Sequence, residues 1–526
     1  MTSAADTSSA EAEVPAVNDV DVVIVGAGFS GLGVAAMLGK AGIRSFRILE
    51  EADDLGGTWR DNTYPGCGCD IPSPLYSYSF DQKPDWTRLF AGQAEILDYL
   101  REVARRRGLI DHARFGQRVQ RARWIEADAR WEILTSTGDS YRARFLICAV
   151  GPLHHPAYPD LPGVETFRGP VFHSANWRHD VDLNGKRVAV IGTGASAIQF
   201  VPAIVDQVAS LTVFQRTPPW IVPKADRPFD ERHRRLARWL PPYRWWVRER
   251  LFWIHENRAA GFVSDPAAME QTAALARRLI KKQVPDPELR EIVTPDYTIG
   301  CKRLLISSDW YPALSKPQVT VHQGGVARVR ADAVVGADGT ETTADVLIYG
   351  TGFDSQNTVR IDIAGRDGRT LAEAWSEGNK AYLGTVVAGF PNMFLMVGPN
   401  TALGHNSQVF MIESQARYIV DSLRRLRRRG AECVEVRPEV QDSYNEWLDS
   451  RMAGTVWQTG GCRSWYQDPR SGRNTVLWPD TTIASGAEPG GPGCRTFSCE
   501  CRGNPIDREP AVALATASAG PRGTES

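Results

Sequence analysis

Three apolar runs that lead into glycine-rich turns stand out along the chain. They are VDVVIVGAGFSG from Val20, KRVAVIGTGASA from Lys186 and ADVLIYGTGF from Ala344. Continuous runs of β-branched and other apolar residues are typical of parallel strands that are buried on both faces of a sheet. The pattern therefore predicts an α/β protein built on parallel sheets.

A different pattern occupies about residues 225–300, where Arg, Trp and Leu dominate, as in RRLARWLPPYRWWVRERLFWIHE. It predicts a helical insertion whose Trp and Leu side chains pack inward while the arginine stems lie outside. A surface that stacks nucleic-acid bases is the alternative interpretation. Residues 1–18 and 485–526 have the small, polar composition of disordered tails. The second tail carries Cys494, Cys499 and Cys501 but no histidine, too few ligands for a closed zinc site.

Composition narrows the class of protein. The chain has 526 residues, a formal net charge of −1 and nine cysteines. The balanced charge argues against a nucleic-acid partner, and no apolar run approaches the roughly 18–20 residues of a transmembrane segment. An odd number of scattered cysteines is not a disulfide framework, and the N-terminus lacks the pattern of a secretory signal. These features predict a multidomain cytoplasmic protein without a metal site.

The first glycine-rich turn has the GxGxxG spacing, with Gly26, Gly28 and Gly31, and Ser30 before the last glycine. It lies between an apolar strand and a segment compatible with a helix. Such glycines let the backbone approach a pyrophosphate, whose charge the helix N-terminus favours. Glu50 ends the next strand, nineteen residues after Gly31, where an acid accepts hydrogen bonds from a ribose. The unit is predicted to bind an adenine dinucleotide with free ribose hydroxyls.

The second turn repeats this arrangement with Gly192, Gly194 and Ala197. Arg216 stands nineteen residues after Ala197, in the position that Glu50 has in the first unit. A cation there suits a 2′-phosphate, whereas an acid would repel it, although a solvated arginine at a strand end is the alternative. The two units together predict FAD plus NADPH, and hence two Rossmann-like dinucleotide-binding domains.

A disulfide reductase would need a redox-active cysteine pair close to the first turn. The nearest candidates are Cys67 and Cys69, and a one-residue spacer strains a disulfide ring. Both are interpreted as turn residues.

Two longer patterns carry a family resemblance. Phe167-x-Gly169-x-x-x-His173-x-x-x-Trp177 resembles the fingerprint of the type I Baeyer–Villiger monooxygenases. The segment from Gly56 to Asp70, GGTWRDNTYPGCGCD, is similar to a second pattern of the same family. The resemblance extends over about residues 20–480. One departure is Arg178, where the family fingerprint usually has Pro or Asp.

The resemblance implies that NADPH reduces FAD, that the reduced flavin takes up O2, and that a flavin C4a-peroxide attacks a ketone to give an ester or lactone. It implies that Arg303, in GCKRLLISSDWY, is the catalytic arginine and that Asp70 is its partner carboxylate. Helix capping is the alternative for Asp70. His173 is expected to act in a hinge between domains rather than as an acid or base.

The resemblance also implies a grip on the 2′-phosphate and its ribose by Arg216, Thr217 and Lys302. Trp465 resembles an active-site tryptophan, with core packing as the alternative. The full cofactor-binding set predicted in this way is Gly26, Gly28, Ser30, Gly31, Glu50, Gly57, Thr58, Trp59, Asp70, Tyr76, Val119, Gly192, Thr193, Gly194, Ser196, Ala197, Arg216, Thr217, Lys302, Arg303 and Trp465.

Two other functions stay open from the sequence. A heteroatom (S or N) oxygenase of the same fold is disfavoured by Trp177 together with Arg303, and a non-oxygenating NADPH-binding flavoprotein is disfavoured by two intact nucleotide turns. The predicted layout is a tail over 1–18, the first part of an FAD domain over 19–152, an NADP domain over 153–388 with its insertion at 225–300, the second part of the FAD domain over 389–484, and a tail over 485–526.

Overall fold

The computed structural model of the chain describes residues 17–486 and 497–498. The remainder of the two predicted tails, including Cys494, Cys499 and Cys501, lies outside the described residues. The N-terminal tail was predicted two residues too long, because Val17 and Asn18 already belong to strand β1 and pair with Ser140 and Tyr141. The backbone of that segment is held by the ladder of the sheet despite its polar composition.

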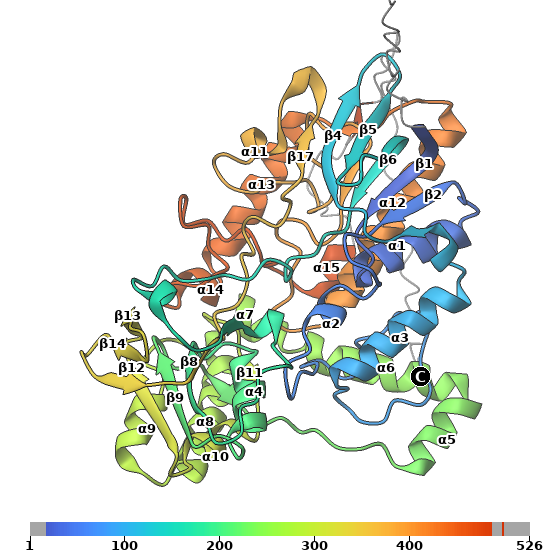
Figure 1. The fold of residues 1–526 in the computed structure, drawn as a ribbon. Coiled ribbons are helices and arrows are strands. Elements are labelled where there is room, and N and C mark those ends of the chain that lie inside the picture. The colour runs from blue at the N-terminus through green and yellow to red at the C-terminus, as the bar shows by residue number, and fades with distance from the viewer. Residues whose placement is uncertain (1–16, 487–496, 499–526) are drawn as a thin grey trace, which may run out of the picture.

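The first of two α/β units is built on an eight-stranded sheet (Figure 1). Its strand order is β17-β4-β5-β6-β1-β2-β3, and β18 pairs with β6. The predicted buried strand is confirmed, since Val22, Val23 and Ile24 of β1 have no exposed surface. The strands are β1 (Val17–Val25), β2 (Phe46–Leu49), β3 (Ala113–Arg114), β4 (Val119–Ile125), β5 (Arg130–Thr135), β6 (Ser140–Cys148), β17 (Asp362–Ala364) and β18 (Met393–Leu395).

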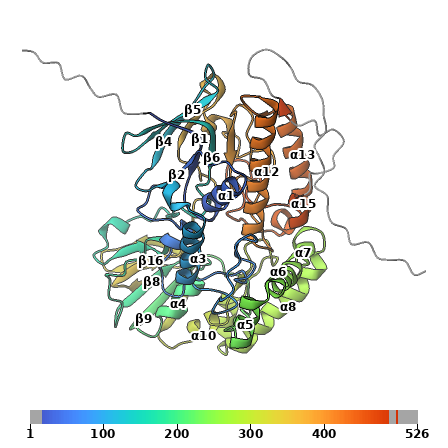
Figure 2. The same ribbon diagram turned by 90° about the vertical axis from the view of Figure 1, so that its right-hand side faces the viewer.

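Helices from both ends of the chain cover this sheet. Helix α1 packs against α12, which follows nearly 370 residues later in the sequence, and Figure 2 shows the two side by side. The chain therefore leaves the first unit after β6 and returns to it. The helices of this unit are α1 (Phe29–Lys40), α2 (Thr58–Asp61), α3 (Gln93–Arg106), α11 (Leu371–Ala374), α12 (Gln408–Arg429), α13 (Pro438–Ala453), α14 (Val456–Thr459) and α15 (Thr482–Gly486).

The chain returns to the first unit earlier than residue 388, the boundary that the sequence predicted. Strand β17 pairs in parallel with β4 of the first sheet, Asp362 opposite Arg121. A three-residue strand carries too short a pattern to reveal its sheet partner. A further short antiparallel pair joins β19 (Glu435–Val436) to β20 (Phe497–Ser498).

The second unit contains a parallel five-stranded sheet with the order β12-β9-β8-β16-β7. Its strands are β7 (Val171–His173), β8 (Arg187–Ile191), β9 (Ser210–Gln215), β12 (Val319–Gln323) and β16 (Val346–Tyr349). Helices α4 (Ala197–Ile204) and α10 (Trp310–Leu314) pack on each other. The smaller pieces are β10 (Ile221–Val222), β11 (Leu305–Ile306) and the antiparallel set β13 (Val326–Val329), β14 (Ala333–Gly336) and β15 (Glu341–Thr343). The prediction of an α/β fold with two Rossmann-like units is confirmed.

The predicted insertion is helical, and its helices are α5 (Glu231–Trp239), α6 (Pro241–Glu256), α7 (Ala259–Val263), α8 (Pro266–Gln283) and α9 (Pro287–Val293). In Figure 2, helices α5, α6, α7 and α8 form the green group at the lower right. Helices α8 and α9 also pack against the core of the second sheet. The predicted inward packing of its tryptophans is wrong for α5 and α6. Trp239, Trp245, Trp246 and Trp253 are all exposed, while Arg248 is buried.

Among the residues that the structure describes, none of the helices has the length and apolar character needed to cross a membrane.

Candidate active site

The first glycine-rich turn, between β1 and α1, has a backbone that only small residues fit. Gly26 has φ of 103°, and a Cβ there would lie 2.6 Å from the carbonyl oxygen of Ala149. A Cβ on Gly31 would lie 1.9 Å from the oxygen of Gly26. At Gly28, by contrast, the nearest atom to a Cβ would be the Cα of Gly57, at 3.7 Å. The turn therefore packs tightly on the protein backbone at Gly26 and Gly31 but leaves space beside Gly28 and Gly57. Such space is what close approach of a pyrophosphate requires.

Glu50, at the end of β2, is buried and held by three donors. Its carboxylate accepts hydrogen bonds from the backbone N–H of Ala27 (2.7 Å) and Ala52 (3.1 Å). The guanidinium of Arg60 forms an ion pair with it at 2.8 Å. A fixed carboxylate beside the glycine turn is an arrangement that can accept hydrogen bonds from a ribose.

The segment that begins at Gly57 lies against the first glycine-rich turn at Gly28. Helix α2 begins at Thr58, and Trp59 donates from Nε1 to the hydroxyl of Tyr76 at 3.2 Å. Burial raises the pKa of Tyr76, so the phenol stays protonated. Val119 is buried at the start of β4, and Ser30 is buried in the first turn of α1.

The second turn, between β8 and α4, repeats the first. Gly192 has φ of 100°, and a Cβ there would lie 2.6 Å from the oxygen of Gly350. At Gly194 the only atom within 4 Å of a Cβ would be that same oxygen, at 3.3 Å. Ser196 precedes α4 and Ala197 is its first residue, and Thr193 Oγ1 donates to the carbonyl of Thr217 at 3.3 Å.

Two cations lie close together at the end of β9. Arg216 is exposed, and burial together with the neighbouring charge of Arg216 lowers the pKa of Lys302. Within the described part of the chain, neither side chain forms a salt bridge with an acid. The Lys302 ammonium instead lies 4.9 Å from the ring centroid of Tyr297. Two unpaired cations side by side suit a phosphate group of charge −2.

Arg303 and Asp70 form an ion pair that joins distant parts of the chain. Asp70 lies between α2 and α3, and Arg303 lies between α9 and β11. Burial disfavours the charged carboxylate, but the charge and hydrogen bond of Arg303 outweigh this and lower the pKa of Asp70. The carboxylate in turn raises the pKa of Arg303. The capping alternative for Asp70 does not apply, because its carboxylate pairs with Arg303.

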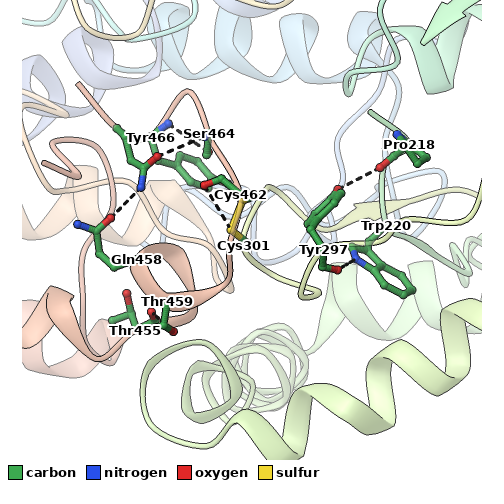
Figure 3. Close-up of a disulfide and its surroundings, with 11 residues drawn as sticks. Pro218, Trp220, Tyr297, Cys301, Thr455, Gln458, Thr459, Cys462, Ser464 and Tyr466 are labelled. Carbon is green, nitrogen blue, oxygen red and sulfur yellow. Dashed lines mark hydrogen bonds between the residues drawn. A yellow bond between two sulfur atoms is a disulfide. The ribbon is translucent and has the colours of Figure 1, made fainter. Parts of the chain in front are cut away.

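A disulfide ties the arginine segment to the loop that carries Trp465. Cys301 and Cys462 are bonded across a sequence separation of 161 residues (Figure 3). The bond lies two residues before Arg303 and four residues before Tyr466. The expectation that the cysteines form no framework missed this bridge, because spacing cannot pair two cysteines so far apart.

Trp465 and Tyr466 face different surroundings. Trp465 is 42% exposed, so the core-packing alternative is wrong, and its ring lies 4.4 Å from that of Tyr466. Tyr466 is buried, which raises its pKa to about 12, while the positive charge of Arg303 acts in the opposite direction. Sequence reasoning missed Tyr466, because one more tyrosine in a loop carries no signal of its own.

The fingerprint residues lie on and beside β7, the edge strand of the second sheet. Phe167 is buried, and a Cβ on Gly169 would lie 2.0 Å from the oxygen of Asp345, so that position needs glycine. His173 has no exposed surface, and burial lowers its pKa to about 4. It is therefore neutral at pH 7, which agrees with a positioning role and not with proton transfer.

Trp177 packs on Phe172 and Phe200, with ring centroids 5.2 and 5.4 Å apart. It also lines a cavity of about 540 Å³ that reaches Arg60 and His154. The unusual residue after it, Arg178, pairs with Asp180 at the surface, Nε to Oδ1 at 2.7 Å.

His154 is a second site residue that the sequence did not single out. It follows β6 and lies 2.6 Å from Glu51 and 3.6 Å from Asp61. These two acids raise its pKa to about 9, so it is positively charged at pH 7. Its place just after the carboxyl end of a parallel strand was the available signal, since ligand-binding residues concentrate there.

The two cysteines near the first turn are not a redox pair. Cys67 and Cys69 are both free thiols. Burial raises the pKa of Cys67 to about 11 and that of Cys69 further, which keeps both in the unreactive thiol form. In the described residues, no three His, Cys, Asp or Glu side chains gather as a metal site.

Comparisons with known proteins agree with this geometry. Residues 23–229 match the model of the family described as pyridine nucleotide-disulphide oxidoreductase. A Baeyer–Villiger monooxygenase of Pseudomonas aeruginosa is 48% identical over 462 residues, which cover 88% of each chain.

Two solved structures share the fold across nearly their whole length. An oxidized steroid monooxygenase bound to NADP has a TM-score of 0.80 and 32% identity, covering 89% of this chain and 96% of its own. The OTEMO complex with FAD and NADP has a TM-score of 0.79 and 27% identity, covering 90% and 97%. The chain belongs to the Baeyer–Villiger monooxygenases, FAD- and NADPH-dependent enzymes that insert one oxygen atom next to a ketone carbonyl to give an ester or lactone.

Proposed function

We propose that Arg303, fixed by Asp70, is the cation that stabilises negative charge on oxygen during the insertion step. When bound, FAD supplies the oxygen chemistry, and NADPH supplies the electrons. A guanidinium that is already oriented by a carboxylate stabilises developing charge without reorganising when the reaction occurs. The single observation that carries this proposal is the Arg303–Asp70 ion pair, which joins residues from two separate parts of the chain.

The roles of the two nucleotide sites follow from their charges. In the first, the turn at Gly26, Gly28 and Gly31 would hold the FAD pyrophosphate, and Glu50 would accept from the ribose of FAD. The wall of that site would come from Gly57, Thr58, Trp59, Tyr76 and Val119. In the second, Gly192, Thr193, Gly194, Ser196 and Ala197 would form the turn for NADPH. Arg216, Thr217 and Lys302 would hold its 2′-phosphate and ribose.

The division into domains follows the same assignment. We assign the first unit, with its return before Asp362, to FAD and the second to NADPH. Pairing of β17 with β4 supports this shift of the boundary from residue 388. His173 would position the connection between the units and move no proton, since it is neutral and buried.

We further propose that Trp465 faces the substrate. Its ring is exposed beside Tyr466, and the disulfide holds its loop near Arg303. The substrate would be an organic ketone oxidised with O2. A cytoplasmic location is supported by the requirement for NADPH, whereas the Cys301–Cys462 disulfide is uncommon in a reducing compartment.

The function is tested by the products formed from a panel of ketones and sulfides with NADPH and O2. We expect at least one ketone to give an ester or lactone whose mass exceeds that of the ketone by one oxygen atom. Sulfoxides without any ester from any ketone would instead establish a heteroatom oxygenase.

A further inference from the structure

Helices α5 and α6 of the insertion carry an exposed aromatic surface that the reaction does not use. We name the surface formed by Trp239, Leu240, Trp245, Trp246, Trp253 and Ile254 the tryptophan face. Its four tryptophans are between 50% and 74% exposed. Twelve large hydrophobic side chains are exposed in the described part of the chain, and half of them lie within residues 239–254. Isolated exposed apolar side chains are ordinary, but such a concentration marks an interaction surface.

Three of the four buried residues of helix α6 are polar, namely Arg248, His255 and Glu256, and the fourth is Phe252. The inner face of the helix carries Arg248, whose Nη1 donates to the carbonyls of Pro74 (2.9 Å) and Ser77 (2.7 Å). On the same side, Glu256 accepts from Asn406 at 2.8 Å. A surface helix normally buries its apolar stripe and exposes its polar one. Here the polar contacts anchor the helix to the first unit and leave the tryptophans outside.

The outer face of α6 presents its rings together. Trp246 and Trp253 are seven residues apart, which places them on one side of the helix two turns apart. Arg250 lies on the same side, with its guanidinium carbon 5.6 Å from the centroid of the Trp246 ring. Trp246, Trp253 and the cation of Arg250 therefore share one side of α6.

The exposed charge along α5 and α6 is predominantly positive. Five arginines along α5 and α6 are exposed: Arg232, Arg234, Arg235, Arg238 and Arg250. Only one acid of the two helices, Glu231, is fully exposed, and it pairs with Arg235 at 3.2 Å. Tryptophan and arginine at one surface are the combination that binds the interface of an anionic bilayer.

We propose that the tryptophan face docks on an anionic phospholipid membrane surface. The rings would enter the headgroup region while the arginines contact lipid phosphates. A second copy of the chain fits less well, because an isologous contact would bring the same arginines against one another. Single-stranded nucleic acid also fits less well, since Arg250 occupies a face of Trp246, and Leu240 and Ile254 offer no ring for a base to stack on. The proposal does not depend on which ketone is oxidised.

The test is flotation of the FAD-loaded full chain with vesicles of phosphatidylcholine containing about 30% phosphatidylglycerol. We expect the wild-type chain to float with these vesicles and much less with pure phosphatidylcholine, and to be released by high salt. The double variant Trp246→Ser/Trp253→Ser should lose on the order of tenfold in binding. Ile110→Ser, which removes an exposed side chain remote in sequence from the tryptophan face, should bind as the wild type does.

Charge is tested separately by Arg232→Glu/Arg234→Glu, with Arg424→Glu/Arg428→Glu on α12 as the matched control. Each arginine near an anionic surface contributes about fivefold, so the first pair should reduce binding at least 25-fold and the control far less. Flavin absorbance and NADPH oxidation like those of the wild type establish that each variant is folded. The proposal is overturned if the wild type does not float, or if both pairs of variants bind equally. It is also overturned if Trp246→Ser/Trp253→Ser converts a dimer into a monomer, or if a single-stranded oligonucleotide binds this face in place of vesicles.

Discussion

The glycine-rich turns of the two nucleotide units have nearly the same backbone conformation, but the residue after the next strand carries opposite charge in the two units. Gly26 and Gly192 both have φ near 100°, and a Cβ on either would collide with a carbonyl oxygen at 2.6 Å. The first unit then places Glu50 at the end of its second strand, and the second unit places Arg216 there. Glu50 is buried and held by three donors, whereas Arg216 is exposed beside Lys302. In the proposed assignment, the shared turn would hold a pyrophosphate, and the single residue after the next strand would distinguish the two cofactors.

Among the variants that test the difference between the two nucleotide sites, Arg216→Ala should have the largest effect. Arg216→Ala removes a charge-assisted hydrogen bond to the 2′-phosphate, so the preference for NADPH over NADH should fall roughly 10- to 100-fold. The ratio of kcat/KM values for the two nucleotides measures it. Arg178→Ala removes another exposed arginine and should leave the ratio unchanged, and an unchanged ratio in Arg216→Ala would refute the assignment.

Glu50→Gln tests the first site in the same way. The substitution removes the charge that Arg60 pairs with and weakens the acceptor for ribose, so FAD should bind about tenfold more weakly. Titration of the apoprotein with FAD, followed by flavin fluorescence, gives the affinity. Glu132→Gln on the exposed side of β5 is the matched control. The preference for NADPH should not move, and if it did, the two sites would not be as separate as the structure indicates.

The disulfide offers a further test of the comparison. It links Cys301, next to Lys302 of the second site, to Cys462 in the part of the chain that returns to the first unit. Cys462→Ser should lower ester formation a few-fold and the melting temperature by a few degrees, since closing a long loop stabilises by about 2–4 kcal/mol. Dithiothreitol should reproduce the loss of ester formation in the wild type. Wild-type behaviour of the variant would mean that the bridge does not position the site.

The smallest expected effect concerns His154, which pairs with Glu51 and Asp61. Its folded pKa of about 9 lies above the ordinary value of 6.5, so its ion pairs stabilise the fold fully below pH 6.5 and cease to do so as the pH rises through 9. His154→Gln should melt about 1–2 °C below the wild type at pH 6, and the difference should vanish by about pH 10. His179→Gln, at an exposed histidine, is the control. A difference that persists at pH 10 would show that the charge is not responsible.

The sequence predicted most of the fold because its strands are long and uniformly apolar. An apolar run such as Val22, Val23 and Ile24 indicates a strand buried on both faces, and these residues are buried. The spacing of the glycines marks the turns that follow such strands. The short strand β17 was not predictable, since three residues carry no period. The orientation of α6 was not predictable, because the number of apolar residues in a helix does not show which face packs against the protein. Three backbone carbonyls accept hydrogen bonds from Arg248 and hold it on the buried face.

The site was predictable only in part. Glu50 and Arg216 followed from their distance to a turn, which the geometry of the unit sets. Arg303 and Asp70 lie 233 residues apart, and their pairing came from the family resemblance alone. The disulfide and Tyr466 depend on how a distant loop returns to the first unit, and no local pattern encodes that return.

The central claim is that Arg303 serves oxygen transfer while Arg216 serves only the nucleotide. The most direct test is the amount of ester formed per NADPH consumed in Arg303→Ala and Arg216→Ala, each at saturating NADPH. Arg303→Ala should still oxidise NADPH but form almost no ester, a loss on the order of 10²- to 10³-fold in the ratio. Arg216→Ala should oxidise NADPH less efficiently yet keep the wild-type ratio. Equal ratios in Arg303→Ala and the wild type would contradict the account.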